Sequence, residues 1–262
     1  MSQDQRMSLT IVGASGSFPG PASPASCYLV QVSDEGRTWN LALDLGNGSL
    51  GALQRHIDPN DLDAIVLSHL HPDHCLDVCS LNVMRTYRPG GPAPDQIDIY
   101  GPAETSARLA RAYGVYGPES LTDQFRFHTI TDGVPVHIGP VRVTAFLVEH
   151  PVEAYGLRVE WNDIVLGYSG DTDLCDGLNR VFHGADLVLA DCAFLDGRDT
   201  IRGIHMTGSR AAQAALNAQG VGRLMLTHIP VWNDPAICQA QASTLWSGEV
   251  EVARPGATYV LS

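Results

Sequence analysis

The stretch Ser68-His-Leu-His-Pro-Asp-His74 is the most informative part of this 262-residue sequence. It follows the apolar run 64–67, which predicts a buried strand. His69 and His71 occupy alternating positions just after that strand, so their imidazoles point the same way. Because neutral imidazole is a common metal ligand, we expect the two rings to hold one cation.

Asp73 and His74 lie beyond the bend that Pro72 introduces, so we expect them to bind a second cation nearby. Four ligand-type side chains within six positions indicate a metal site, because burying so many polar groups without partners would be costly. Four ligands do not complete two metal sites. The remaining ligands are therefore expected where other strands end.

Three further candidate ligands come just after apolar, strand-like runs, where α/β proteins gather their active sites. They are His150 after 143–148, Asp171 after 164–168 and His228 after 223–226. A carboxylate has two oxygens and can bridge two cations, which is a natural role for Asp171. Taken singly, each of these residues could instead cap a strand or serve a turn.

Apolar runs rich in β-branched and aromatic residues predict strands along the whole chain, with helical patterns between them. The strands are expected at 9–12, 27–32, 39–43, 64–67, 97–100, 141–147, 155–159, 164–168, 187–190, 224–227 and 257–261. The helices are expected at 76–87, 104–113, 177–182, 207–218 and 235–245. This mixture predicts an α/β fold, an αββα four-layer sandwich with two sheets face to face and helices outside. The length fits one large domain over residues 1–262.

The composition, with 44% hydrophobic and 17% charged residues, is that of a globular protein with a sizeable core. The net charge of −13 argues against a long nucleic acid as partner, which usually needs a basic face. It does not exclude a small anionic substrate, because bound divalent cations would dominate the field inside the site. With neither a signal-like start nor an apolar run that could span a bilayer, we expect a cytoplasmic protein with no membrane partner.

Residues 13–24 are rich in Gly, Ser and Pro and follow the first predicted strand. This composition favours a plain turn. A phosphate-binding loop is the alternative, although the segment carries neither a P-loop nor a dinucleotide-binding glycine pattern.

The series of candidate ligands resembles the metallo-β-lactamase superfamily, in that superfamily's order and over essentially the whole chain. The resemblance implies one metal held by His69, His71, His150 and Asp171, and another held by Asp73, His74, His228 and the shared Asp171. It also implies that Asp44, at the end of another early strand, hydrogen-bonds a ligand region instead of binding metal.

A later segment is similar to the ribonuclease Z-like branch, whose members cleave phosphodiesters. His205-Met-Thr-Gly208 and the Ala-rich stretch 209–215 match its His-x-Thr segment and the helix that follows. The resemblance implies that His205 assists at the phosphate or the leaving group. Asp191 falls where this branch has a Glu, and it would orient His205 or a metal ligand. Satisfying the local backbone is the alternative role for Asp191.

Two departures count against ribonuclease Z itself. That enzyme grips RNA with a long arm inserted between its third His and its bridging Asp, whereas a short stretch separates His150 from Asp171. The position three before the bridging Asp, a Glu in that enzyme, is Tyr168 here. The missing arm and the negative charge both favour a small substrate.

Stretches spread along the chain resemble bacterial cyclic-AMP phosphodiesterases of an atypical class II type, built on the ribonuclease Z-like fold. They are 13–17, 23–26, 51–56, 68–77 and 226–232. The resemblance implies hydrolysis of a 3′,5′-cyclic nucleotide, cyclic AMP first, to the 5′-monophosphate. Asp73 would accept the nucleophile's proton and His205 would act at the leaving group. Relatives in this branch often dimerise, so a homodimer is implied as well.

The expected cofactors are two divalent metal ions. The mixed nitrogen and oxygen ligands favour zinc, and manganese also fits the oxygen-rich second position. Three alternatives stay open: a ribonuclease Z-type endonuclease for tRNA 3′ ends, a phosphodiesterase for another small cyclic phosphate, and a non-catalytic regulator that binds a cyclic nucleotide or a metal. The last of these predicts the loss of one or more ligands.

Overall fold

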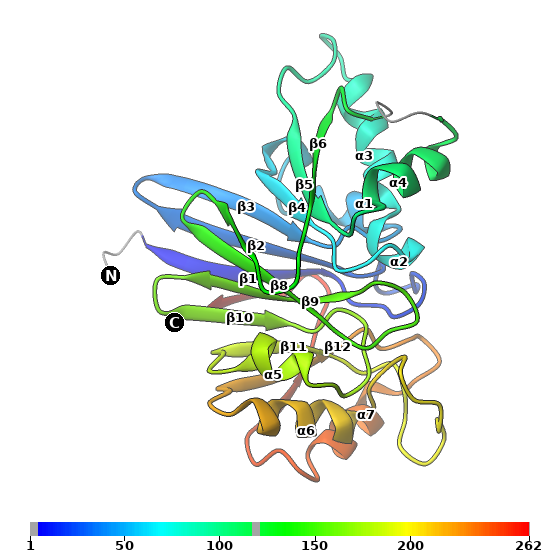
Figure 1. Ribbon diagram of the computed structural model, residues 1–262, viewed down its shortest axis with the longest axis vertical. Coiled ribbons are helices and arrows are strands. Elements are labelled where there is room, and N and C mark those ends of the chain that lie inside the picture. The colour runs from blue at the N-terminus through cyan, green and yellow to red at the C-terminus, as the bar shows by residue number, and fades with distance from the viewer. Residues whose placement is uncertain (1–4, 117–120, 262) are drawn as a thin grey trace.

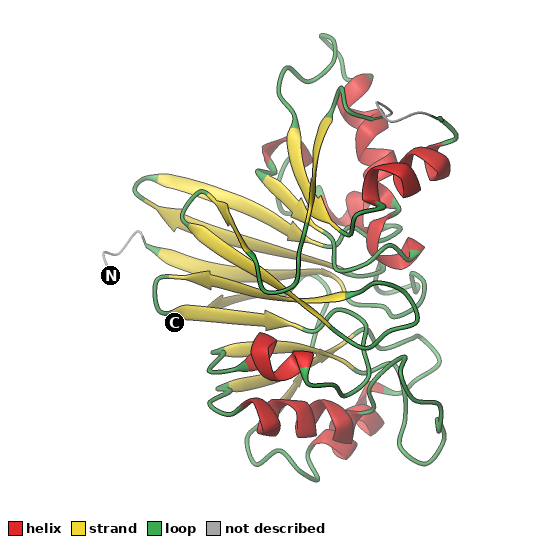
Figure 2. Cartoon of the chain, viewed as in Figure 1, coloured by secondary structure: helices red, strands yellow, loops and turns green. Residues whose placement is uncertain are grey.

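Two sheets lie face to face in this protein, and helices cover the outer face of each (Figure 1, Figure 2). The structure is a computed structural model that describes residues 5–116 and 121–261. The αββα four-layer sandwich predicted from the sequence is therefore confirmed. Within the two described ranges, no helix combines the length and the apolar character that crossing a membrane requires.

The first sheet has the strand order β14-β1-β2-β3-β4-β5-β6. Its half from β14 to β3 is antiparallel, and β3 to β6 are parallel. In chain order the strands are β1 Arg6–Gly13, β2 Cys27–Asp34, β3 Arg37–Leu43, β4 Ala64–Val66, β5 Ile97–Gly101, β6 Phe125–Thr129 and β14 Thr258–Leu261.

The second sheet repeats this mixed arrangement, with the order β13-β12-β11-β10-β9-β8-β7. Strands β7 to β10 are antiparallel and β10 to β13 are parallel. They are β7 Pro135–Ile138, β8 Val141–Leu147, β9 Tyr155–Trp161, β10 Ile164–Tyr168, β11 Leu187–Asp191, β12 Arg223–Thr227 and β13 Val250–Val252.

The helices divide between the two outer faces. The first sheet carries α1 Ser49–Leu53, α2 Pro72–Cys75, α3 Asp77–Thr86 and α4 Thr105–Tyr113, with the 3-10 turn η1 Pro59–Asp61. The second sheet carries α5 Gly177–Phe182, α6 Gly208–Ala218 and α7 Pro235–Ala242. Thr207 caps α6 by accepting a hydrogen bond from the backbone N–H of Arg210 at 3.4 Å.

Strand β2 illustrates why the inner strands are apolar on both faces. Tyr28, Val30 and Val32 point into the core between the sheets, whereas Cys27 and Leu29 point into the core beneath the helices. Successive side chains of a strand face opposite ways, so a strand covered on both sides needs a continuous apolar run. Such runs made these strands recognisable in the sequence.

Several weaker elements were not predicted. Strands β6, β7 and β13 and the short helices α1 and α2 were missed, whereas the predicted helix 76–87 corresponds closely to α3. Each of the three missed strands lies at the edge of its sheet. Edge strands bury less of each face, so their apolar pattern is short and interrupted, and in β7 a proline begins the strand.

The parallel halves of the two sheets determine where polar residues gather. The segments that leave β3 and β4 in one sheet, and β10, β11 and β12 in the other, all carry polar side chains toward the same side of the sandwich. Loops at the ends of packed strands are well placed to carry function on a rigid scaffold. This edge therefore holds the candidate site.

Candidate metal centre

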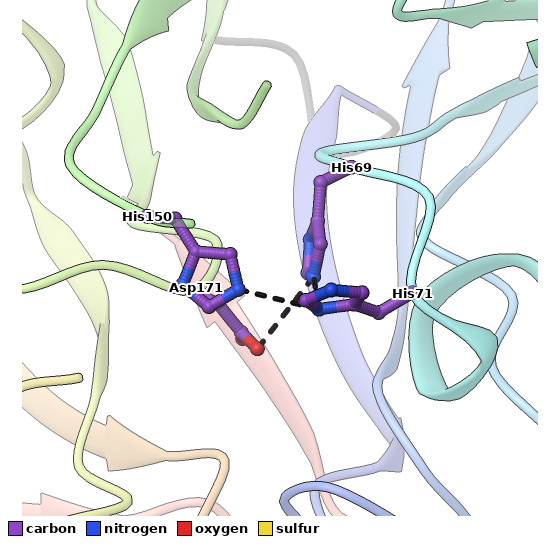
Figure 3. Close-up of side chains that lie close together, drawn as sticks. All are labelled: His69, His71, His150 and Asp171. Carbon is purple, nitrogen blue, oxygen red and sulfur yellow. Dashed lines mark hydrogen bonds and ion pairs between the residues drawn. The ribbon is translucent and has the colours of Figure 1, made fainter. Parts of the chain in front are cut away.

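Four side chains from three separate segments form the first ligand group: His69, His71, His150 and Asp171. Their ligand atoms all lie within 4.8 Å of one another. His71 Nδ1 lies 3.1 Å from His69 Nε2 and 3.2 Å from His150 Nε2. Figure 3 shows the rings of His69 and His71 on one side of this group and His150 and Asp171 on the other. Three imidazole nitrogens and a carboxylate oxygen can enclose one cation.

The second ligand group contains Asp73, His74, His228 and again Asp171. Asp171 Oδ1 lies 3.1 Å from His74 Nε2, and Asp171 Oδ2 lies 3.2 Å from His228 Nε2. Asp73 Oδ2 lies 3.5 Å from His74 Nε2. Since Asp171 belongs to both groups, its two oxygens can bridge two cations.

Four imidazoles are held by their Nδ1 atoms, which leaves Nε2 turned toward the cluster. The Nδ1 partners are Ser68 Oγ for His69 at 3.1 Å, Asp44 Oδ2 for His74 at 2.7 Å, the Ile204 carbonyl for His150 at 2.9 Å, and Ser26 Oγ for His228 at 3.0 Å. In a neutral ring whose Nδ1 carries the proton, Nε2 is an acceptor. This arrangement fixes both tautomer and direction, as metal-binding histidines require.

The converging atoms are acceptors that need a positive charge between them. In the described part of the chain, His74 Nε2 and Asp171 Oδ1 are buried and have no hydrogen-bond partner. Buried polar atoms are usually satisfied, so these two atoms without a hydrogen-bond partner, 3.1 Å apart, indicate that the cluster holds a ligand. Nitrogen and oxygen donors in this combination suit a divalent ion such as zinc. The residues present therefore fit a pair of metal ions.

The protonation states also fit metal binding. Burial lowers the pKa of His69, His150 and His228, which keeps these rings neutral and able to ligate. Burial raises the pKa of Asp171, but its interactions with the adjacent His228 and His74 rings outweigh burial and hold the pKa well below its usual range. Asp171 is therefore an anion.

Asp44 belongs to neither ligand group, but it holds residues around the cluster in place. Besides His74, it accepts hydrogen bonds from the Ser68 backbone N–H at 2.7 Å and from the Tyr168 hydroxyl at 2.7 Å. Its backbone is left-handed, with φ of 59°, a conformation that Asp tolerates better than most residues. Asp44 and Tyr168 are fully or almost fully buried, so this network orients His74 without contact with water.

His205 and Asp191 form a pair beside both ligand groups. His205 Nδ1 lies 2.8 Å from Asp191 Oδ2, and the His205 ring centroid lies 5.5 Å from that of His150 and 5.4 Å from that of His228. Burial lowers the pKa of His205, but the charge and hydrogen bond of Asp191 outweigh it and raise the pKa to about 9. Asp191 also accepts hydrogen bonds from the backbone at Thr172 and Ala193, so it serves both roles considered for it.

The structure brings together every side chain that the sequence marked as a ligand, and it places His205 and Asp191 next to them. Their roles toward metal and substrate stay predictions. Sequence reasoning did not identify Tyr168, Ser26 and the Ile204 carbonyl as parts of the site. Tyr168 occupies a position where ribonuclease Z has a Glu, and Ser26 lies in one of the stretches that resemble the cyclic-AMP phosphodiesterases. A backbone carbonyl gives no signal in a sequence.

A family model described as the beta-lactamase superfamily domain matches residues 42–229. The chain therefore belongs to the beta-lactamase superfamily, and with its histidine and aspartate cluster it is a metallo-hydrolase of that family. The resemblance to this superfamily is thereby confirmed.

Relatives extend along almost the whole chain. An uncharacterized protein of Mycobacterium leprae is 41% identical over 254 residues, covering 96% of this chain and 87% of its own. The probable metallo-hydrolase YhfI of Bacillus subtilis is 28% identical over 95% of this chain and 98% of its own length. Its crystal structure aligns with a TM-score of 0.85 over 97% of this chain and 99% of that one. A ribonuclease BN of Citrobacter koseri is 26% identical over 89% of this chain and 92% of its own.

Asp171→Asn should lower the metal content of the protein. A neutral amide offers one carbonyl oxygen and no charge, so it cannot bridge two cations. After loading with zinc and dialysis, mass spectrometry of the metal should find about two ions per chain in the wild type and about one or none in Asp171→Asn.

His128→Ala is the matched control for this experiment. His128 is a partly exposed residue of β6, and its Nε2 lies 2.7 Å from Asp98 Oδ1 on β5. It belongs to neither ligand group, so its loss should leave the metal content unchanged. Retention of both ions by Asp171→Asn would refute the shared-carboxylate assignment.

Proposed function

We propose that this protein is a dinuclear-metal phosphodiesterase that hydrolyses 3′,5′-cyclic nucleotides, cyclic AMP first, to 5′-monophosphates. The observation that carries the proposal is the His205–Asp191 pair beside both ligand groups. A cationic imidazole next to a metal pair suits a reaction that develops charge on phosphate and must protonate an alkoxide leaving group.

Two features favour a small substrate over RNA. The connection between His150 and Asp171 consists of the hairpin β9–β10 and short turns, which leaves no extended arm to hold a folded RNA. The net charge of −13 disfavours the many phosphate contacts that a long nucleic acid needs. A cyclic nucleotide carries one phosphate, which two cations and His205 can neutralise.

Asp73 is the residue we assign to proton removal. Burial raises the pKa of Asp73, but the hydrogen bond and charge of His74 outweigh it and lower the pKa to about 2. The carboxylate is therefore ionised at neutral pH and can accept the proton of the attacking water. When bound, the two cations supply Lewis acidity, which neutralises phosphate charge and lowers the pKa of that water.

His205 is the residue we assign to the leaving group. Because Nδ1 is bound to Asp191, Nε2 is the ring nitrogen that donates. Water oxygen forms a bond to phosphorus while the bond from phosphorus to the ribose 3′ oxygen breaks. The 3′ oxygen takes the electron pair of that bond together with the His205 proton, and the product is the 5′-monophosphate.

An activity panel tests this function directly. The zinc- or manganese-loaded protein is assayed with cyclic AMP, cyclic GMP, bis(p-nitrophenyl) phosphate, a lactone, a thioester and a tRNA precursor. We expect turnover of the cyclic nucleotides to 5′-monophosphates, identified by chromatography. Cleavage of the tRNA precursor or the thioester without turnover of either cyclic nucleotide would contradict the proposal.

The His205–Asp191 pair makes a second, independent prediction. His205→Asn should keep its metal content and lose about 10²- to 10⁴-fold in kcat, the usual contribution of a general acid. In Asp191→Asn the raised pKa of His205 falls, so the acid form is lost at lower pH. The alkaline limb of the kcat profile should therefore move to lower pH than in the wild type. An unchanged limb, or full activity of His205→Asn, would exclude His205 as the acid.

A further inference from the structure

Two aromatic side chains from opposite ends of the sequence form an exposed pair. Phe18 is 39% exposed and Trp232 is 59% exposed, and their ring centroids lie 5.1 Å apart with the planes tilted by 45°. Large aromatic side chains gain much by burial, so a pair left in contact with water is a candidate binding surface. We call Phe18 and Trp232 the aromatic pair.

The aromatic pair lies on two segments that join at His228. Ser15 forms a parallel β-bridge with Ile229, the residue after His228. The backbone N–H of Ser17 donates a hydrogen bond to His228 Nε2 at 3.3 Å, and Ser26 Oγ lies 3.0 Å from His228 Nδ1. Phe18 therefore follows a residue that touches a candidate metal ligand. Both segments that carry the aromatic pair are thus joined to His228, a member of the second ligand group.

Close packing fixes these two segments against each other. A Cβ on Gly16 would lie 2.3 Å from the carbonyl oxygen of His228, and a Cβ on Gly20 would lie 2.2 Å from Val231 Cγ1. Such contacts leave no room for a side chain at either glycine, so the approach depends on their lack of one. Ser15 Oγ donates to the Phe18 carbonyl at 2.7 Å.

The Trp232 segment is anchored as well. The backbone N–H of Asn233 donates to the Pro230 carbonyl at 2.9 Å, which closes a turn around Val231 and Trp232. Asn233 is 6% exposed, and its Nδ2 donates to the Ala193 carbonyl at 2.8 Å. The backbone that carries both rings is therefore ordered before any ligand arrives, which reduces the entropy cost of binding.

We infer that the aromatic pair is the base-binding surface of this site, on which the purine of a cyclic nucleotide stacks while its phosphate lies at the two ligand groups. This inference rests on the proposed function. An uncharged aromatic face suits an uncharged base in a protein with net charge −13. Stacking depends on the area of the base face and not on the hydrogen-bonding groups at its edges. The aromatic pair should therefore bind the large face of a purine without distinguishing adenine from guanine.

The test compares ligands that differ by the base alone. Calorimetric titration of the zinc-loaded protein with 5′-AMP and with ribose 5-phosphate measures binding without turnover. Trp232→Ala should raise the Kd for 5′-AMP about 5- to 100-fold, the usual effect of losing one stacking ring, and leave the Kd for ribose 5-phosphate unchanged. Trp232→Phe keeps a ring and should recover most of the affinity. Steady-state kinetics with cyclic AMP should show the same loss in KM more than in kcat.

Tyr87→Ala is the matched control, because Tyr87 is 72% exposed at the end of α3 and belongs neither to the two ligand groups nor to the aromatic pair. Equal weakening of both ligands in Trp232→Ala, or no weakening of either, would overturn the inference. If cyclic AMP is hydrolysed but the Kd for 5′-AMP is the same in Trp232→Ala and the wild type, the proposed function stands and the assignment of the base-binding surface is wrong. If 5′-AMP binding depends on Trp232 but cyclic AMP is not hydrolysed, the surface stands and the proposed function is wrong.

Discussion

The carboxylate of Asp171 is the group on which the rest of the site depends. It is 2% exposed, and its oxygens lie 3.1 Å from His74 Nε2, 3.2 Å from His228 Nε2 and 3.7 Å from His69 Nε2. A buried carboxylate without compensating positive charge is very costly, so an ion here must be paired or coordinated. Acceptor atoms surround it on both sides. Two bound cations would compensate the buried charge of Asp171, and coordination of both by this one carboxylate would link them.

The fold makes this arrangement possible because two sheets end at one edge. Residues after β4, β8, β10 and β12 reach the same point, although they come from distant parts of the sequence. Backbones approach closely there. A Cβ on Gly46 would lie 1.9 Å from the carbonyl oxygen of Asp73, so the Gly46 segment supports the ligand loop directly. Ligands on the ends of packed strands are held more precisely than ligands on long free loops.

The inner strands and all of the candidate ligands could be predicted from the sequence, but the support around them could not. Inner strands such as β2 are buried on both faces, and this produces the continuous apolar runs that identify them. The edge strands β6, β7 and β13 bury less and lack this signal. His69 and His71 stand out by residue type and spacing. The hydroxyl of Tyr168 reaches Asp44 across the space between the sheets, and no local pattern predicts such a contact.

Asp171 is proposed to hold two metal ions at once. Anomalous X-ray scattering from zinc-loaded crystals, recorded on both sides of the zinc absorption edge, tests it most directly. We expect two anomalous peaks, one surrounded by His69, His71 and His150 and the other by Asp73, His74 and His228, with an oxygen of Asp171 about 2.0–2.2 Å from each. A single peak, or two peaks of which one lies beyond the reach of Asp171, would contradict it.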